Sequence, residues 1–514
     1  MKKIKENLDI IVIGSGIGGL VTASQLASKG AKVLVLEKYL IPGGSGGSFK
    51  RKGYTFDVGA SMIFGFGDKG YTNLLTRALK DIGENCETIP DPVQLEYHLP
   101  NNFNLSVDRK YEEFIKKLVN RFPHEEKGIR KFYGTCEKVF KCLDSMPLLS
   151  IEDPNYLFKV FLKSPLSCLG LARWLPINAG DVAKKYINDP ELLKFIDIEC
   201  FCWSVMPALK TPMINAGMVF TDRHVGGINY PKGGVGQIAE KLVSGLEKLG
   251  SSIRYKANVN EILIRDNRAI GVKLSNGETL YAENIVSNST RWDTFGLKGH
   301  NEGLVKKTYV PKREYKWAET YKASPSFVSI HLGVNSKIIS EKFNCHHIIV
   351  EKWEELENEK GVIFISIPTL LDPTLAPEGK HIVHAFTPSS IQEWENLKRK
   401  DYLEKKESYF KFIIDKISKI IPNISENIDH KEIGTPRTHK KFLGRFEGSY
   451  GPIPNKKLLG LLPMPFNTTK IKNFYCVGDS CFPGQGLNAV AFSGYACSHK
   501  IGAKLNLNSK DLPN

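Results

Sequence analysis

The sequence has no apolar segment that is long and uniform enough to cross a membrane. The longest apolar N-terminal stretch, residues 10–27, contains four glycines and has the pattern of a strand, a turn and a helix. We expect the first strand to begin near Leu8, which leaves no room for a signal or transit peptide before it. These absences favour a bacterial protein that lies on the cytoplasmic side and has no transmembrane helix.

Paired cysteine motifs and nucleic-acid modules are also missing. The ten cysteines form no CxxC pair, and Cys200 and Cys202 lie too close for an ordinary disulfide, so we interpret them as reduced thiols. The net charge of +16 comes mostly from scattered lysines, with no zinc-finger spacing and no arginine-rich helix. Nucleic acid is therefore not expected as a partner. A solvated basic surface and contact with anionic lipid both remain open.

The length of 514 residues exceeds one ordinary core and predicts two domains. Strand, glycine-rich turn and helix patterns occur near both ends, and a predicted strand at residues 285–288 returns to the first sheet. We therefore predict an α/β fold with a discontinuous Rossmann-type FAD-binding domain, of the glutathione reductase-like kind, and a mixed α+β substrate domain. The first comprises residues 1–70, 215–300 and 440–514. The second comprises residues 71–214 and 301–439, and its stretch from residue 71 to about residue 210 is expected to be mostly helical.

The first motif is the glycine-rich turn after the β-branched run at residues 10–13. Gly14 permits a tight turn, Gly16 lets the backbone approach a pyrophosphate, and Gly19 lets the following helix pack closely on the strand. The N-terminus of that helix offers free N–H groups and the positive end of its dipole to phosphates. This arrangement predicts dinucleotide binding, whereas a purely structural turn is the alternative.

Glu37 strengthens this prediction because it ends the second strand, 18 residues after Gly19 (37 − 19), where a carboxylate meets a ribose hydroxyl. The adjacent Lys38 is included among the cofactor-binding candidates, although it does not by itself indicate a 2′-phosphate. Val259, in a predicted hairpin of residues 259–274, is expected beside the adenine. A plain core valine is the alternative there.

A second glycine-rich segment, residues 42–49, follows directly. Gly43 and Gly44 permit positive φ angles and close backbone approach, so we expect this loop to wrap the second phosphate and the flavin side of the cofactor. Many proteins of this fold carry an arginine after the two glycines, where this chain has Ser45. Phosphate contacts must then rely more on backbone N–H groups.

The third motif, residues 474–486, again places a strand before a glycine turn and a helix. Gly478 and Asp479 are expected at the ribityl or pyrophosphate side, with a helix-capping aspartate as the alternative. The helix that begins near Gly486 points its positive end at the flavin pyrimidine, which stabilises negative charge on reduced flavin. Two matched motifs at opposite ends of the chain indicate FAD in place of NAD.

Three weaker candidates have ordinary explanations. Asp57 lies near the expected flavin and is the only catalytic candidate, although a turn-capping role is favoured. His346 and His347 suggest a metal, but no carboxylate or cysteine cluster completes a site in the sequence, so no metal is predicted. Residues 146–176 mix large apolar side chains with Lys159, Lys163 and Arg173, which fits shallow insertion into a lipid interface. A buried helical cap over a substrate tunnel is the alternative.

Over its full length the chain resembles the carotenoid isomerases (prolycopene isomerases), a branch of the bacterial-type phytoene desaturase superfamily. The stretches Trp-Asp-Thr-Phe at residues 292–295 and Met-Pro-Phe-Asn-Thr-Thr at 464–469 are the more specific to this branch. The other matching segments are residues 37–44, 53–59, 288–291, 370–379, 450–454 and 476–486. Leu487-Asn488 departs locally, since smaller or aliphatic residues are expected there.

The resemblance implies conversion of poly-cis lycopene to all-trans lycopene with no net redox change and with reduced FAD. It implies a carotenoid substrate, an electron donor for FAD reduction and a cyanobacterial source. Residues 146–176 and the basic surface separately predict that the protein is peripheral on a membrane. The alternatives are a carotenoid desaturase or a retinol saturase-like oxidoreductase, which turns over with net redox change, and a carotenoid carrier with structural FAD.

Overall fold

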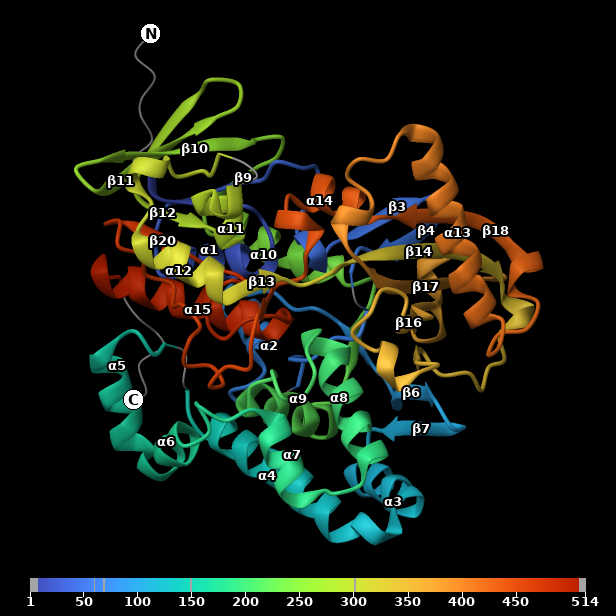
Figure 1. Ribbon diagram of the computed structural model, residues 1–514. Coiled ribbons are helices and arrows are strands. Elements are labelled where there is room, and N and C mark those ends of the chain that lie inside the picture. The colour runs from blue at the N-terminus through green and yellow to red at the C-terminus, as the bar shows by residue number, and fades with distance from the viewer. Residues whose placement is uncertain (1–7, 60, 68–69, 148–149, 300–301, 508–514) are drawn as a thin grey trace.

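The computed structural model describes residues 8–59, 61–67, 70–147, 150–299 and 302–507. Two seven-stranded sheets organise this part of the chain, and they occupy different regions of the molecule (Figure 1). The first sheet runs in the order β10-β11-β12-β1-β2-β9, with β20 paired to β12. Its strands are β1 (Leu8–Ile13), β2 (Val33–Leu36), β9 (Ser252–Arg254), β10 (Val259–Arg265), β11 (Arg268–Leu274), β12 (Thr279–Ser287) and β20 (Phe474–Cys476).

The first sheet is built around β1, whose last four residues are buried and mostly β-branched. Such a run suits a strand covered on both faces, and β1 pairs in parallel with β2 on one side and β12 on the other. Three helices pack beside it: α1 (Ile17–Ala27), α10 (Gly236–Lys248) and α15 (Leu487–Lys504). The predicted return of residues 285–288 to this sheet and the predicted 259–274 hairpin are confirmed.

The second sheet runs in the order β18-β14-β17-β16-β15-β6-β7. One face packs against α13 (Arg399–Ile417) through a core that includes Ile330, Leu332, Trp394 and Ile413. The strands are β6 (Val93–Leu99), β7 (Phe103–Asp108), β14 (Ser326–Asn335), β15 (His346–Ile349), β16 (Ile363–Ser366), β17 (Lys380–Ser389) and β18 (Ile428–Gly434).

The prediction that residues 71–214 are mostly helical misses this sheet's edge. The β6–β7 hairpin lies within them, and residues 93–99 alternate between buried and more exposed side chains over much of their length. That alternation indicates a strand, and Asn101 and Asn102 both have positive φ at the turn between the two strands. The first sheet takes its strands from residues 8–36, 252–287 and 474–476, while the exact domain bounds stay a prediction.

Most remaining helices form the lower layer in Figure 1, where α4 packs against α9 and α7. They are α3 (Tyr111–Arg121), α4 (Glu126–Asp144), α5 (Pro154–Lys163), α6 (Pro165–Ala172), α7 (Ala179–Tyr186), α8 (Pro190–Ser204) and α9 (Met213–Val225). Above this layer, α2 (Leu74–Asp81) packs against α10 and α15. Elsewhere lie α11 (Arg291–Phe295), α12 (Lys312–Thr320) and α14 (Pro436–Leu443), and the two-stranded pairs β3 (Ser48–Arg51) with β4 (Tyr54–Asp57), β5 (Thr88–Pro90) with β8 (Asn229–Pro231), and β13 (Tyr321–Ala323) with β19 (Pro452–Pro454).

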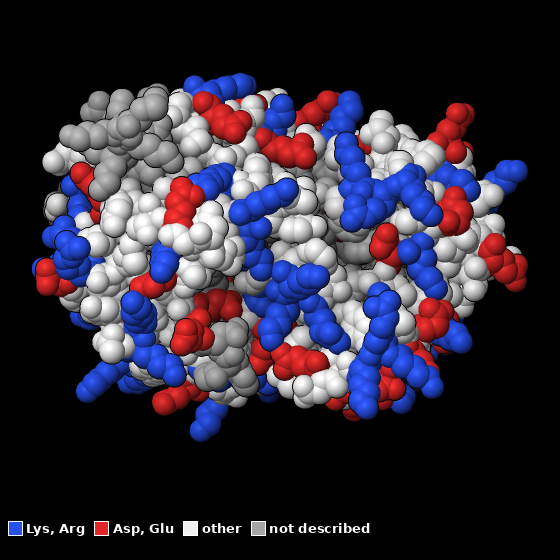
Figure 2. Space-filling model, turned by 90° about the horizontal axis from the view of Figure 1, so that it is seen from above, with Lys and Arg blue, Asp and Glu red and all other residues white. Residues whose placement is uncertain are grey.

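Within the described ranges, no helix combines the length and the apolar character that crossing a bilayer requires. The excess positive charge does not form one uniform field. On the face seen from above, basic side chains gather near the middle and acidic ones stand among them (Figure 2). A mixed surface of this kind is what the scattered lysines in the sequence predict.

Candidate functional site: a dinucleotide cavity

The turn between β1 and α1 has the geometry that its glycines predict. Gly14 has a φ of +92°, a conformation that favours glycine, and Gly16 is the extended residue that precedes α1. A Cβ on Gly19 would lie 2.4 Å from the carbonyl oxygen of Gly14, so this glycine allows the close helix–strand packing. A Cβ on Gly16 would lie 2.7 Å from Nδ2 of Asn288. The helix N-terminus has no side-chain cap and no acidic residue in its first turn.

Glu37 follows β2 directly and reaches the same turn. Its Oε2 accepts hydrogen bonds from the backbone N–H of Ser15 at 2.9 Å and from the Ser15 hydroxyl at 2.6 Å, while Oε1 accepts from the N–H of Tyr39 at 2.8 Å. Lys38 donates from Nζ to the carbonyl oxygen of Lys441 at 3.0 Å, and its partial burial lowers its pKa. The carboxylate is thus held beside the phosphate turn, where a ribose hydroxyl could replace Ser15 as a partner.

The second glycine-rich loop lies against the first. The N–H of Gly43 donates to the carbonyl oxygen of Ser15 at 2.8 Å, and Gly43 and Gly16 form a parallel bridge. Gly43 and Gly44 have φ angles of +100° and +56°, as close backbone approach requires. The hydroxyl oxygen of Ser45 is buried and has no hydrogen-bond partner among the described residues. A buried hydroxyl of this kind calls for a polar partner from a bound group.

The C-terminal motif brings β20 and α15 beside the same turn. Gly478 has a φ of +98° and packs against Gly18, since a Cβ on Gly18 would lie 3.2 Å from the Gly478 nitrogen. Asp479 is mostly buried and forms an ion pair with Arg445. Gly486 has a φ of +102° and precedes α15, which has no side-chain cap and no acidic residue in its first turn. The helix therefore begins with unpaired N–H groups and a positive dipole end.

A cavity of about 510 Å³ lies beside the two N-terminal glycine-rich loops and Glu37. It is bounded by segments from the N-terminal, central and C-terminal parts of the chain, and its size suits a cofactor site. The predicted residues that line it are Gly14, Gly16, Glu37, Lys38, Gly44, Ser45 and Val259. The other predicted residues do not line it: Gly19, Gly43, Gly478, Asp479 and Gly486. Gly19 and Gly43 support the two glycine-rich loops. Asp479 forms an ion pair with Arg445, which does line the cavity.

Arg445 and Asn288 both line the cavity, and neither was predicted from the sequence. Asn288 directly follows β12, and its side chain lies close to the Cβ positions of Gly14, Gly16 and Gly18. The carboxyl ends of parallel strands are where ligands bind in such folds, so its place after a returning strand was the available signal. Arg445 has no comparable signal because only the folded chain brings it to Asp479. Other lining residues not predicted are Arg51, Asn258, Thr290, Asp293 and Thr438.

Asp57, the catalytic candidate, is fully engaged within the protein. Its carboxylate accepts hydrogen bonds from the hydroxyls of Ser48, Ser61 and Tyr230, and from the N–H of Val235 at 2.8 Å. Burial raises its pKa, and these donors act in the opposite direction. Four donors from three segments give this side chain a connecting role, and a catalytic role stays a prediction.

The fold and the cavity define a flavoprotein of the oxidoreductase type. The family described as flavin containing amine oxidoreductase matches residues 17–501, so the chain belongs to this family, and its cofactor is FAD. A solved structure of cyclohexylamine oxidase from Brevibacterium oxydans shares the fold, with a TM-score of 0.61 and 13% identity over 97% of this chain and 100% of that one. The glycine turns, Glu37 and the unpaired Ser45 hydroxyl fit FAD as the group these residues would hold.

Two plant proteins are much more similar. The chain is 55% identical over 98% of its length to the chloroplastic prolycopene isomerases of Daucus carota and Arabidopsis thaliana, covering 81% and 84% of those proteins. The neurosporene-forming phytoene desaturase of Cereibacter sphaeroides is 25% identical over 93% of this chain and 92% of that protein. The family resemblance seen in the sequence motifs is confirmed. The expectation of a bacterial, cytoplasmic-side protein is wrong, because these plant relatives are chloroplastic.

Proposed function

We propose that this chain is an FAD-dependent carotenoid isomerase that converts poly-cis lycopene to all-trans lycopene without net redox change. The observation that carries the proposal is the 55% identity to prolycopene isomerases along almost the whole chain. Identity to the desaturase is less than half as high over a similar span. A difference of this size favours the isomerase over an enzyme with net redox turnover.

Reduced FAD is the form that we propose to be active. Bound reduced flavin supplies an electron-rich ring next to the polyene. The chain's own contribution is the start of α15, where Gly486 leaves the helix N–H groups without a side-chain cap and no carboxylate lies in the first turn. Such a helix end favours negative charge in its vicinity. Arg445, which is partly buried and paired with Asp479, places its guanidinium at the cavity.

The test is anaerobic incubation of the FAD-loaded enzyme with tetra-cis lycopene, followed by chromatography and mass analysis of the products. We expect all-trans lycopene of unchanged mass from reduced enzyme and no conversion by oxidised enzyme. A product lighter by two hydrogens, or activity only with oxidised enzyme and an acceptor, would establish the desaturase alternative. Pigment that binds without conversion in either state would establish the carrier.

We also propose that anionic lipid is a partner and that it contacts α5 and α6. Phe158, Leu162, Leu166 and Leu169 are 62%, 63%, 83% and 61% exposed, although leucine and phenylalanine usually lie inside. The two helices lie at the lower left of Figure 1, and Pro154 and Pro165 begin them, so neither extends into a long helix. This exposure supports a lipid interface over the buried cap considered from the sequence.

A second segment, residues 459–462, adds exposed leucines near α6. The N–H of Leu461 donates to the carbonyl oxygen of Leu175 at 2.9 Å, which ties the segment to the chain just after α6, and Leu459 and Leu462 are exposed beside it. Lys159 is exposed on α5, and Arg173 is exposed directly after α6. Apolar side chains with basic neighbours match the boundary between acyl chains and anionic headgroups.

Flotation with phosphatidylglycerol vesicles tests this contact. The double change Leu162→Asp and Leu166→Asp should weaken vesicle binding by roughly tenfold or more, because two leucines no longer bury apolar area in lipid. Leu403→Asp, at a half-exposed leucine on α13, is the matched control and should bind like the unchanged chain. Equal flotation of the double variant and the control would refute the proposal. Vesicle binding that does not weaken as the salt concentration rises would also refute it.

A further inference from the structure

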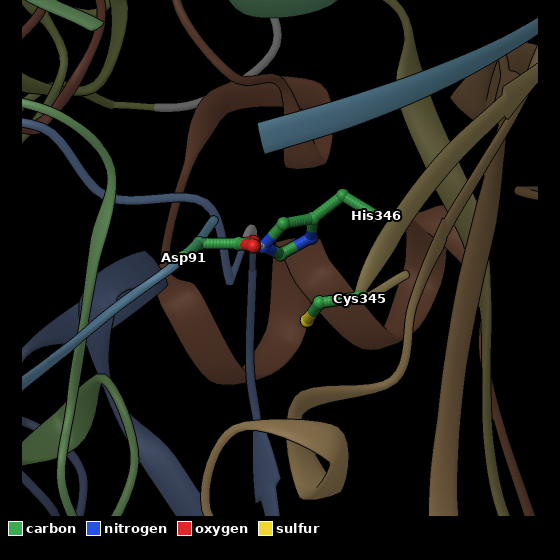
Figure 3. A group of neighbouring side chains, drawn as sticks. All are labelled: Asp91, Cys345 and His346. Atoms are coloured by element: carbon green, nitrogen blue, oxygen red, sulfur yellow. Dashed lines mark ion pairs between the residues drawn. The ribbon is translucent and has the colours of Figure 1, made fainter. Parts of the chain in front are cut away.

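Asp91, Cys345 and His346 converge beside strands β6 and β15 of the second sheet, outside the dinucleotide cavity (Figure 3). Asp91 directly follows β5, while Cys345 and His346 stand at the start of β15. All three side chains are buried, and one ligand atom from each lies within 4.8 Å of the others. Distant segments of the chain thus bring together a carboxylate, a thiol and an imidazole, the three ligand types that zinc accepts most often.

Two atoms of this cluster have no hydrogen-bond partner among the described residues. The outer atoms are engaged: Nδ1 of His346 meets the Ser366 hydroxyl at 2.9 Å, and the N–H of Val93 donates to Oδ1 of Asp91 at 3.2 Å. The inner atoms, Nε2 of His346 and Oδ2 of Asp91, are buried and unpartnered. They face each other at 3.6 Å, which is too long for a hydrogen bond.

The same separation suits two ligands of one metal ion. Zinc binds imidazole nitrogen at about 2.0–2.1 Å and carboxylate oxygen at about 2.0–2.2 Å, so two such ligands at a tetrahedral angle lie roughly 3.3 Å apart. A slightly wider angle gives the observed distance. The serine hydroxyl on the far nitrogen fixes the ring orientation, and the backbone N–H fixes the carboxylate, as outer partners do in zinc sites.

Charge supports the same assignment. A buried carboxylate without a paired cation is costly, and Arg109 acts on Asp91 only through space because its guanidinium hydrogen-bonds Asn229 and Gly226. A divalent ion would neutralise one carboxylate and one thiolate and leave no net charge buried. We propose that Asp91, Cys345 and His346 bind Zn²⁺, which links the β5–β8 pair to β15 of the second sheet.

His347 does not take part, although the sequence places it beside His346. Its Nε2 meets the carbonyl oxygen of Asn344 at 2.9 Å, and its Nδ1 meets His98 at 3.2 Å. Neighbouring residues of a strand point to opposite faces, so the histidine pair cannot act as one unit. The sequence predicted no metal because the completing ligand, Asp91, is distant in the chain.

The experiment uses the full FAD-loaded chain, dialysed against chelator and then against Zn²⁺. Elemental analysis should find about one zinc per chain, and X-ray absorption should find one sulfur at about 2.3 Å. Cys345→Ser and Asp91→Asn should each lower zinc affinity by at least roughly tenfold. Cys142→Ser removes a thiol elsewhere and should keep the zinc.

Where a variant fails to fold, the test uses the thermal midpoint of the unchanged protein. Its thermal midpoint should fall when the chelator removes zinc and recover when zinc is restored, because the ion binds the folded state. The proposal would be overturned if no zinc is bound after dialysis against Zn²⁺, or if the bound zinc has no sulfur neighbour. It would also be overturned if the two ligand variants and the control bind equal zinc.

Discussion

The cofactor cavity and the layer of helices around α8 and α9 place their buried polar groups differently. Around the β1–α1 turn, Glu37, Asn288 and the Ser45 hydroxyl lie at a cavity of about 510 Å³, where a bound molecule can reach them. In the helical layer, Glu199 of α8 and Arg223 of α9 form a buried ion pair at 2.7 Å within packed protein. Asp222 is also buried there. The first group is open to a bound molecule, whereas the second contributes to the stability and pH response of the fold.

The largest expected effect comes from Gly16→Val in the cofactor region. The Cβ position already lies 2.7 Å from the Asn288 side chain, and a branched side chain would also occupy the approach to the pyrophosphate. We expect at least a hundredfold weaker FAD binding, measured by flavin absorbance after purification and by titration with FAD. Gly134→Val, in α4 where an added Cβ meets nothing within 4 Å, should keep its flavin. A full flavin spectrum in the Gly16 variant would contradict the assignment of the phosphate turn.

Asp479→Ala should have an intermediate effect. The change leaves the Arg445 guanidinium without its carboxylate partner in a mostly buried place, which costs about 3–5 kcal/mol when one member of such a pair is removed. We expect FAD to dissociate more readily and activity to recover in part when FAD is added in excess. Titration of activity against FAD measures this. If activity stays low when FAD saturates the protein, Asp479 acts on the reaction and not only on cofactor retention.

Asp222→Asn should have the smallest effect, confined to stability. Burial, reinforced by the charge of Asp144, raises the pKa of Asp222 to about 7. Because this lies above the unfolded value of about 3.9, the folded chain holds a proton that the unfolded chain releases. The contribution of Asp222 to the free energy of unfolding is therefore fully present below about pH 4. It is lost as pH rises to about 7, and the loss is at most about 4 kcal/mol.

Thermal unfolding of the FAD-loaded protein at about pH 5 and about pH 8 measures this loss. The asparagine side chain that replaces Asp222 does not titrate, so the variant should show a smaller difference between the two pH values than the unchanged chain. Identical pH dependence in both proteins would mean that Asp222 does not titrate in this window.

The cofactor region could be predicted because its motifs impose backbone geometry. Gly14 and Gly43 adopt positive φ, and such a requirement is visible in the sequence as a glycine at fixed spacing from a strand. Glu37 follows from the same unit because its distance along the βαβ segment is fixed. The return of β12 to the sheet of β1 and β2 follows from its buried apolar run.

Contacts between segments that are remote in the sequence could not be predicted to the same depth. The β6–β7 hairpin was readable from its alternation, but the sheet partner of β6 is β15, which is remote in sequence. Arg445 reaches Asp479, and Asp91 reaches Cys345, only through tertiary packing. Neither contact has a local pattern, because side-chain ion pairs and ligand clusters impose no spacing on the chain.

Counting product molecules per reduction of the flavin tests the central claim most directly. Enzyme reduced once, with the excess reductant removed under anaerobic conditions, is given poly-cis lycopene in large molar excess. An isomerase returns its flavin to the starting state, so many all-trans lycopene molecules of unchanged mass should form per FAD. No conversion by the reduced enzyme, or one product per flavin accompanied by a loss of two hydrogens, would contradict the account.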